Sequence, residues 1–222
     1  MNKIYNSWVF IASILALLYA FFASMYDTFG IFVKIAPFIE RLHKEYVFGF
    51  TALFIFLLNA RRSYKKWTGM AVVNKTNRFL FNTPISKDRK KTVILYNTLE
   101  IFTFLILGIG FVLLSLDATI ITLVFFLVIT DMGINFFLGI NSKKYRIGMT
   151  KKAIVTADRE VLPIYFKGLK RITKQGIRLY FEYVNDLVLD INIESIPPEK
   201  QEEFINLLRE TVDEKKVYFS GF

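Results

Sequence analysis

The sequence contains no cysteine and a single histidine, His43. The lack of cysteine excludes disulfides, thiolate nucleophiles and cysteine-ligated metal sites. His43 has no neighbouring serine, so a catalytic triad or a histidine-rich metal site has no candidate. Neither a Walker-type phosphate loop nor a dinucleotide-binding fingerprint occurs. These absences predict a protein that is not an enzyme and that holds no cofactor and no metal.

Charged residues are distributed unevenly along the 222 residues, 54% of which are hydrophobic. Uncharged apolar runs dominate residues 1–142, and runs of about 20 such residues are long enough to cross a bilayer. We expect a transmembrane domain over 1–142 and a small soluble domain over 143–222. The predicted spans cover residues 5–26, 42–60, 92–116 and 118–140.

Lysine and arginine predict the orientation of these spans. Residues 61–91, between the second and third spans, hold ten of them against the single acid Asp88, and Lys143, Lys144 and Arg146 follow the fourth span. By the positive-inside rule, this basic loop and the C-terminal domain are both cytoplasmic. An even number of spans then places the N-terminus in the cytoplasm too. Richness in Lys, Ile, Asn and Phe suggests a bacterial gene, and hence a multi-pass protein of the inner (plasma) membrane.

Short segments of alternating polarity characterise the soluble part, and they are rich in β-branched and aromatic residues, as strands are. The segments are 145–147, 153–156, 161–165, 169–172, 177–181 and 187–193. Turn-forming residues separate them, including Gly168, Gly176 and Asp186. Pro197 and Pro198 then introduce a helix of about four turns. The sequence therefore predicts an α+β domain with one curved antiparallel sheet and a C-terminal helix.

The chain resembles the bacterial pleckstrin-homology-like domains carried on transmembrane helices, over about residues 144–214. Four features carry the resemblance: Tyr145-Arg146-Ile147 directly after a span, the strand Leu162–Tyr165, the strand Gly168–Ile172, and the Pro-Pro-Glu start of the helix. Domains of this family are binding or assembly modules, and some relatives form oligomers. The resemblance therefore implies a module that binds a partner, a lipid surface or its own copies, and it implies no enzyme.

Basic residues beside the predicted spans are candidates for contact with anionic lipid headgroups, because near-surface lysine and arginine are attracted to them. These candidates are Arg61, Arg62, Lys65, Lys66, Lys90, Lys91, Lys143, Lys144 and Arg146, while Arg89 in the same run is left unassigned. The alternative is that these charges reflect topology and a solvated face alone. No recognition motif accompanies the charge, so nucleic acid is not an expected partner.

Two carboxylates lie within predicted spans, where ionisable groups are costly and usually face a partner or a cavity. Glu100 and Asp131 are nearly equidistant from the tight turn between the third and fourth spans, with Asn97 and Asn135 one helical turn away. The four residues define a candidate polar site that binds a proton or a cation. The alternative is a packing role, with each carboxylate neutral or directed to Arg61, Arg62 or the membrane interface.

Three functions are consistent with these features. The first is a non-enzymatic membrane scaffold or regulatory subunit, acting as a homo-oligomer or within a membrane complex. The second is an oligomeric ion or proton channel gated by the cytoplasmic domain. The third is a permease-like transporter subunit, since residues 81–86 resemble a cytoplasmic elbow of some export permeases. The segment that precedes the elbow, 65–81, fits either an interfacial helix or a cytoplasmic extension of the second span.

Overall fold

The computed structural model describes residues 3–30, 44–159, 161–212 and 217–221. His43 and the predicted start of the second span at Leu42 lie outside the described residues. The chain forms two compact units that alternate along the sequence. We call the first the helical unit (Met1–Ser63 and Thr98–Gly133) and the second the sheet unit (Tyr64–Asn97 and Ile134–Phe222). Three long helices contribute residues to both units, so the units do not divide at the predicted boundary near residue 142.

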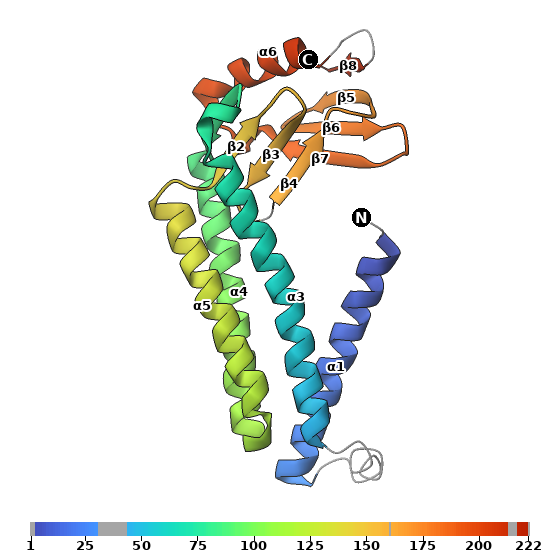
Figure 1. The fold of residues 1–222 in the computed structure, drawn as a ribbon, viewed down its shortest axis with the longest axis vertical. Coiled ribbons are helices and arrows are strands. Elements are labelled where there is room, and N and C mark those ends of the chain that lie inside the picture. The colour runs from blue at the N-terminus through green and yellow to red at the C-terminus, as the bar shows by residue number, and fades with distance from the viewer. Residues whose placement is uncertain (1–2, 31–43, 160, 213–216, 222) are drawn as a thin grey trace. The chain divides into compact units, whose positions relative to one another are not determined.

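Helices form at all four predicted places (Figure 1): α1 (Lys3–Phe29), α3 (Lys44–Val73), α4 (Lys87–Leu114) and α5 (Thr119–Asn141). α3 and α4 extend furthest beyond the predicted spans, since α3 continues past Ala60 to Val73 and α4 begins at Lys87. The segment 61–91 is therefore largely helical and is not a loop. Hydropathy marks only the apolar part of a helix, whereas Arg, Lys and Met favour helix as well and let the backbone hydrogen bonds continue.

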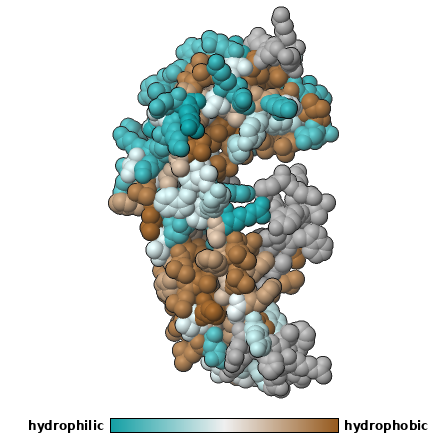
Figure 2. Space-filling model, in the orientation of Figure 1, coloured by the Kyte–Doolittle hydropathy of each residue, from teal (hydrophilic) through white to brown (hydrophobic). Residues whose placement is uncertain are grey.

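Among the described residues, two helices are long and apolar enough to cross a membrane, Lys87–Leu114 and Leu116–Asn141. Large apolar side chains on α3, α4 and α5 are exposed, Phe50, Phe102, Leu113 and Leu127 among them. Figure 2 shows mostly hydrophobic residues over these helices and mostly hydrophilic residues over the sheet unit. Such exposed apolar helix surfaces are typical of contact with lipid.

Small residues pack the helices of the helical unit together. Ala20 and Ala23 of α1 are buried in one cluster with Phe48 and Ala52 of α3. Small side chains let helix backbones approach closely. Between α4 and α5, the Thr122 hydroxyl donates a 2.9 Å hydrogen bond to the Gly108 carbonyl. The short helix η3 (Leu116–Ala118) joins these two helices as the predicted tight turn.

In the described residues of the sheet unit, eight strands form two four-stranded sheets, in place of the single predicted sheet. Sheet A has the order β1 (Phe81–Pro84), β2 (Arg146–Met149), β3 (Ala153–Ala157), β4 (Val161–Tyr165) and is antiparallel. Sheet B has the order β7 (Val188–Asn192), β6 (Arg178–Tyr183), β5 (Leu169–Gln175), β8 (Tyr218–Ser220), with β8 parallel to β5. All six predicted strands are confirmed, whereas β1 and β8 are additional.

The three predicted turn residues take the backbone conformation for which they are suited. Gly168 has φ +84° and Gly176 has φ +56°, which glycine adopts without steric cost. Asp186 has φ +58°, a conformation that aspartate tolerates better than most residues. These turns connect β4 to β5, β5 to β6, and β6 to β7, and they bring the tips of the strands to fixed positions.

The core of the sheet unit lies between the two sheets and α6 (Gln201–Thr211). Phe204 and Leu208, one helical turn apart on α6, are fully buried there. The Phe204 ring meets Phe81 of β1 edge to face, with centroids 5.3 Å apart. The predicted helix is confirmed, but it begins after the short helix η5 (Pro198–Lys200) and is shorter than expected. Pro197 and Pro198 therefore precede α6 and do not form its first turn.

Candidate functional site

Glu100 on α4 forms a bidentate ion pair with Arg62 on α3 inside the helical unit. The Arg62 Nη2 donates a 3.0 Å hydrogen bond to Oε2, and Nη1 pairs with Oε1. Two parallel hydrogen bonds between a guanidinium and a carboxylate are the strongest form of such a pair. Both oxygens of Glu100 are therefore engaged by Arg62, one of the partners that the sequence suggested for this carboxylate.

The remaining members of the predicted polar site belong to different parts of the molecule. Asp131 lies in the helical unit with Glu100, whereas Asn97 and Asn135 belong to the sheet unit. Asn97 is buried and donates to the carbonyl of Val93 on its own helix at 3.0 Å. Asn135 accepts a hydrogen bond from a tyrosine described below. Each amide thus has a local role, and a common proton or cation site stays a prediction.

The predicted lipid-contact residues separate into two groups. Arg61, Lys65, Lys91 and Lys143 are exposed, although Lys91 pairs with Asp88 at 3.1 Å. Lys90 and Lys144 are half-buried, and three other cations are directed into the protein. Arg62 pairs with Glu100, Lys66 is buried, and Arg146 donates from Nε to Oδ1 of Asn82. Partial burial lowers the pKa of Arg146 from its usual value.

Tyr145 joins the end of α5 to sheet A. Its hydroxyl donates to Oδ1 of Asn135 at 3.0 Å and approaches the Asn135 carbonyl at 3.3 Å. Its ring covers Gly139 so closely that a Cβ there would overlap it, and Met70 of α3 and Val93 of α4 complete the surrounding cluster. Only 3% of Tyr145 is exposed. We call this arrangement the Tyr145 joint.

Burial raises the pKa of the Tyr145 hydroxyl well above its ordinary value, and the negative charge of Asp158 raises it further. The hydroxyl therefore remains a hydrogen-bond donor throughout the physiological pH range. Main-chain contacts strengthen the same region, since Ile85 N–H donates to the Tyr145 carbonyl at 3.2 Å and Asn74 Nδ2 donates to the Lys144 carbonyl at 3.0 Å. The joint thus connects α3, α4 and α5 with β2.

A second ion pair attaches the beginning of α4 to the end of β3. Arg89 Nε lies 2.7 Å from Oδ2 of Asp158, whose side chain is 2% exposed. A buried carboxylate requires such a partner, because an unpaired charge in this environment is costly. Arg89 was left unassigned among the predicted lipid contacts, and no local pattern relates it to an aspartate 69 residues further along the chain.

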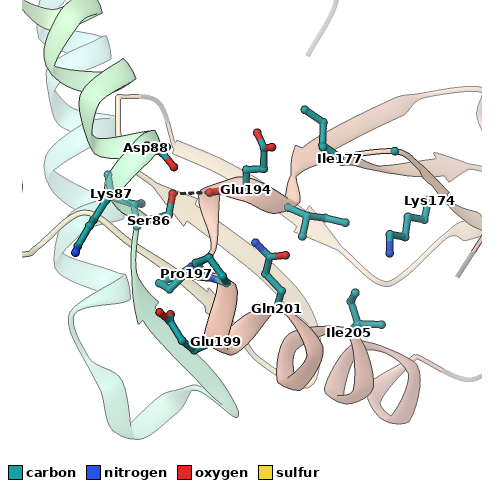
Figure 3. A pocket seen from close by; sticks show the side chains of 14 residues that line it. Ser86, Lys87, Asp88, Lys174, Ile177, Glu194, Pro197, Glu199, Gln201 and Ile205 are labelled. Atoms are coloured by element: carbon teal, nitrogen blue, oxygen red, sulfur yellow. Dashed lines mark hydrogen bonds between the residues drawn. The ribbon is translucent and has the colours of Figure 1, made fainter.

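A groove of about 720 Å³ lies where α4, the β5–β6 hairpin and α6 meet (Figure 3). Its apolar surface comes from isoleucines and prolines: Ile85, Ile177, Ile193, Ile205, Pro197 and Pro198. Charged side chains surround them: Lys87, Asp88, Lys174, Glu194 and Glu199. Apolar surface with a few polar groups is the usual composition of a binding site.

The start of α4 forms one wall of this groove. The Ser86 N–H donates to the Ser195 carbonyl at 2.9 Å, and the Ser86 hydroxyl donates to the Glu194 carbonyl, as Figure 3 shows. The same hydroxyl oxygen accepts from Arg89 N–H at 3.1 Å and caps the helix. The Ser86 hydroxyl is therefore engaged in hydrogen bonds within the protein. The groove offers a surface for binding and not a reactive serine.

No hydropathy or motif signal in the sequence indicated the groove, because its walls come from segments about 90 to 120 residues apart along the chain. Within the part of the chain that the structure describes, no group of three or more metal-ligating side chains occurs. Comparison with protein-family models, with curated proteins and with solved structures gives no match for this chain. Its function is therefore inferred from its own geometry.

Proposed function

We propose that this protein is a non-enzymatic membrane scaffold or regulatory subunit whose sheet unit binds a partner segment in the groove of Figure 3. One observation carries the proposal: residues 85–88 form a wall of the groove and include the first residues of α4, which begins at Lys87. A ligand there touches α6, the β5–β6 hairpin and the first residues of α4 at the same time. Binding can therefore bias the position of α4 without a separate relay.

The membrane anchor of this proposal consists of α1, α3, α4 and α5 crossing a bacterial inner membrane, with both termini in the cytoplasm. The exposed apolar surfaces of the helices support it, as does the concentration of Lys and Arg in residues 61–91 and after Asn141. The resemblance to pleckstrin-homology-like domains belongs to the same proposal. Two sheets, antiparallel except for β8, together with α6 support it, with β1 supplied from between two helices.

Single-cysteine labelling tests the anchor, because the chain has no cysteine of its own. Phe29→Cys at the end of α1, Leu116→Cys between α4 and α5, and Glu203→Cys on α6 are each treated with a membrane-impermeant maleimide in intact cells. Four spans predict labelling at 29 and 116, and labelling at 203 only after permeabilisation. Protection of 29 would reduce the anchor to α4 and α5, and labelling of 203 in intact cells would reverse the orientation.

The mass of the nanodisc-purified protein with its co-purifying species tests the function. We expect a monomer or small oligomer that carries a partner in fixed stoichiometry, and we expect Ile177→Lys in the groove to release that partner. Val188→Lys, at a similarly exposed apolar residue outside the groove, is the matched control and retains it. A closed homo-oligomer of four or more copies with no partner would contradict the proposal and favour a pore.

The Arg62–Glu100 ion pair favours the scaffold over a channel or a permease-like subunit, because the carboxylate is already engaged by an arginine. We therefore expect that proton and cation flux into reconstituted vesicles is the same for the unsubstituted protein and for Glu100→Gln combined with Asp131→Asn. Flux that is present and is abolished by the double substitution would identify the two carboxylates as parts of a conduction path.

A further inference from the structure

A second cavity of the sheet unit is lined by both sheets and by the start of α4. Its volume is about 280 Å³, and residues of β4 and β7, each the edge strand of its sheet, contribute to its walls. The residues that line it differ from those that line the groove of Figure 3. Sites for drug-sized ligands usually measure about 300–1,000 Å³, so this volume suits a smaller molecule. We call it the intersheet cavity.

Two ion pairs line the intersheet cavity, and each leaves hydrogen-bonding groups available. Arg89 holds Asp158 through Nε at 2.7 Å, so the two Nη groups of its guanidinium make no hydrogen bond within the described residues. Arg178 holds Oδ2 of Asp190 through Nη1 at 2.9 Å, and within the same residues Oδ1 of Asp190 has no partner. The cavity therefore presents guanidinium donors together with a carboxylate acceptor.

A buried hydroxyl adds a further polar group to the same walls. Thr156 on β3 lines the cavity and is only 8% exposed, and its Oγ1 has no hydrogen-bond partner in the part of the chain that the structure describes. Buried hydroxyls normally have such a partner, because an unpaired one has lost its bonds to water without replacement. A ligand in the cavity would supply the missing partner.

The charges and the apolar residues of the cavity together select a class of ligand. Two arginines and two aspartates leave its walls without net charge, so an anion or a cation would add an uncompensated charge to a partly enclosed site. A zwitterion adds none. Its carboxylate matches the planar fork of a guanidinium, and its ammonium matches a carboxylate. Val161, Leu162 and Ile191 supply apolar surface beside these groups.

We propose that the intersheet cavity binds a small amino acid with an apolar side chain, of the size of alanine, valine or leucine. The ligand carboxylate accepts from Arg89, Arg178 and the Thr156 hydroxyl, and the ligand ammonium donates to Asp190. Because Arg89 belongs to α4, the start of this helix gains a contact that depends on the amino-acid concentration. The inference goes beyond the proposed function, since the site includes neither the groove nor its partner.

Isothermal titration calorimetry of the full chain in detergent tests the site, with L-alanine, L-valine and L-leucine as separate probes. We expect at least one of them to bind with one molecule per chain and to raise the unfolding temperature. The N-acetyl and amide derivatives of that amino acid each lack one of its two charges. We expect each derivative to bind about tenfold more weakly or worse, because hydrogen bonds between charged groups are the stronger ones.

Two variants identify the residues responsible. Arg178→Gln is expected to weaken binding about tenfold or more. Its matched control is Arg171→Gln, which removes a similarly exposed, ion-paired arginine outside the cavity and leaves the affinity unchanged. Thr156→Val is expected to weaken binding about threefold or more without lowering the unfolding temperature, because it removes a buried hydroxyl that has no partner. A purely structural role for Thr156 would give the opposite pattern.

Each of the following results would overturn the proposal. If none of the amino acids gives a binding heat or shifts the unfolding temperature, the cavity does not bind this class of ligand. Equal affinity for the N-acetyl or amide derivative would show that the zwitterion is not what is recognised, and full affinity of Arg178→Gln would place the binding elsewhere. None of these outcomes bears on partner retention in the groove, so the proposed function is decided by its own test.

Discussion

Tyr145 contacts several elements of the sheet unit. Its hydroxyl donates to Asn135 on α5, its ring lies on Gly139, and its carbonyl accepts from Ile85 before α4. A buried hydrogen bond of this kind has a modest net value, but loss of one partner leaves the other unpaired. The contribution of this side chain can therefore be measured by removing the hydroxyl alone.

Tyr145→Phe is expected to lower the free energy of unfolding by about 1–2 kcal/mol, because Oδ1 of Asn135 loses its donor. The measurement is thermal or denaturant unfolding in detergent, and Tyr218→Phe at an exposed tyrosine is the matched control. The pKa of the Tyr145 hydroxyl is higher in the folded protein than in the unfolded protein. The neutral hydroxyl therefore makes its full contribution to stability below about pH 10, and that contribution is lost as the pH rises further. The difference in the free energy of unfolding between the unsubstituted protein and Tyr145→Phe should thus be constant from about pH 6 to pH 8.

Gly139 tests the packing of the same ring. Gly139→Ala places a Cβ where the Tyr145 ring lies, so we expect destabilisation of about 1–3 kcal/mol from the forced displacement. Gly133→Ala on the same helix is the control, because a Cβ there has no atom within 4 Å and alanine favours helix over glycine. Equal unfolding temperatures for the two variants would show that the ring does not fix the end of α5.

At the scale of elements, the Arg62–Glu100 pair fixes α4 against α3. Removal of either partner leaves a charge in apolar surroundings, whereas removal of both does not. We expect Arg62→Met and Glu100→Gln each to destabilise the protein by about 2 kcal/mol, and the double substitution to cost less than their sum. A double-mutant cycle by thermal unfolding in nanodiscs gives the coupling. Strict additivity would mean that the pair contributes nothing to helix packing.

Strand β1 is the element that ties the connection between α3 and α4 into sheet A. Its register pairs Phe81 with Met149 and Pro84 with Arg146. Asn82 adds a hydrogen bond of 2.7 Å from Nδ2 to the Val73 carbonyl at the end of α3. The strand therefore contacts the end of one long helix and immediately precedes another, which makes its position sensitive to both.

At the scale of the whole molecule, the sheet unit depends on residues that lie between the helices. We expect residues 143–222 alone to lack a cooperative fold, because they lose Phe81 from the core and the edge of β2 is unpaired. Loss of a buried phenylalanine costs about 3–5 kcal/mol, which approaches the whole stability of many small domains. Urea unfolding and the dispersion of amide NMR signals measure this directly.

A chimaera provides the control for this fragment. Residues 79–86 joined by a short glycine-serine linker to the start of 143–222 restore β1, because Pro84 lies opposite Arg146 in the antiparallel ladder. We expect the chimaera to give a dispersed spectrum and a cooperative transition. Cooperative unfolding of 143–222 without the added strand would show that β1 is dispensable and that the predicted boundary near residue 142 is a true domain boundary.

The sequence by itself determined the elements whose signals are local. Runs of about 20 apolar residues gave the positions of the helices, and alternation of polarity gave β2 to β7. Gly168, Gly176 and Asp186 gave turns because few other residues tolerate positive φ. The ends of α3 and α4 were misplaced, since hydropathy stops at Ala60 while helical hydrogen bonding continues to Val73.

Only the tertiary structure decided which distant residues meet. Arg89 reaches Asp158 and Arg62 reaches Glu100 across many residues of sequence, and the short segment Phe81–Pro84 pairs with β2 although α4 and α5 separate the two strands along the chain. Hydrophobic periodicity in the sequence shows which face of a helix or strand is buried. It does not show which other element packs against that face. The groove and the Tyr145 joint both arise from such pairings, which explains why no single stretch of sequence predicted them.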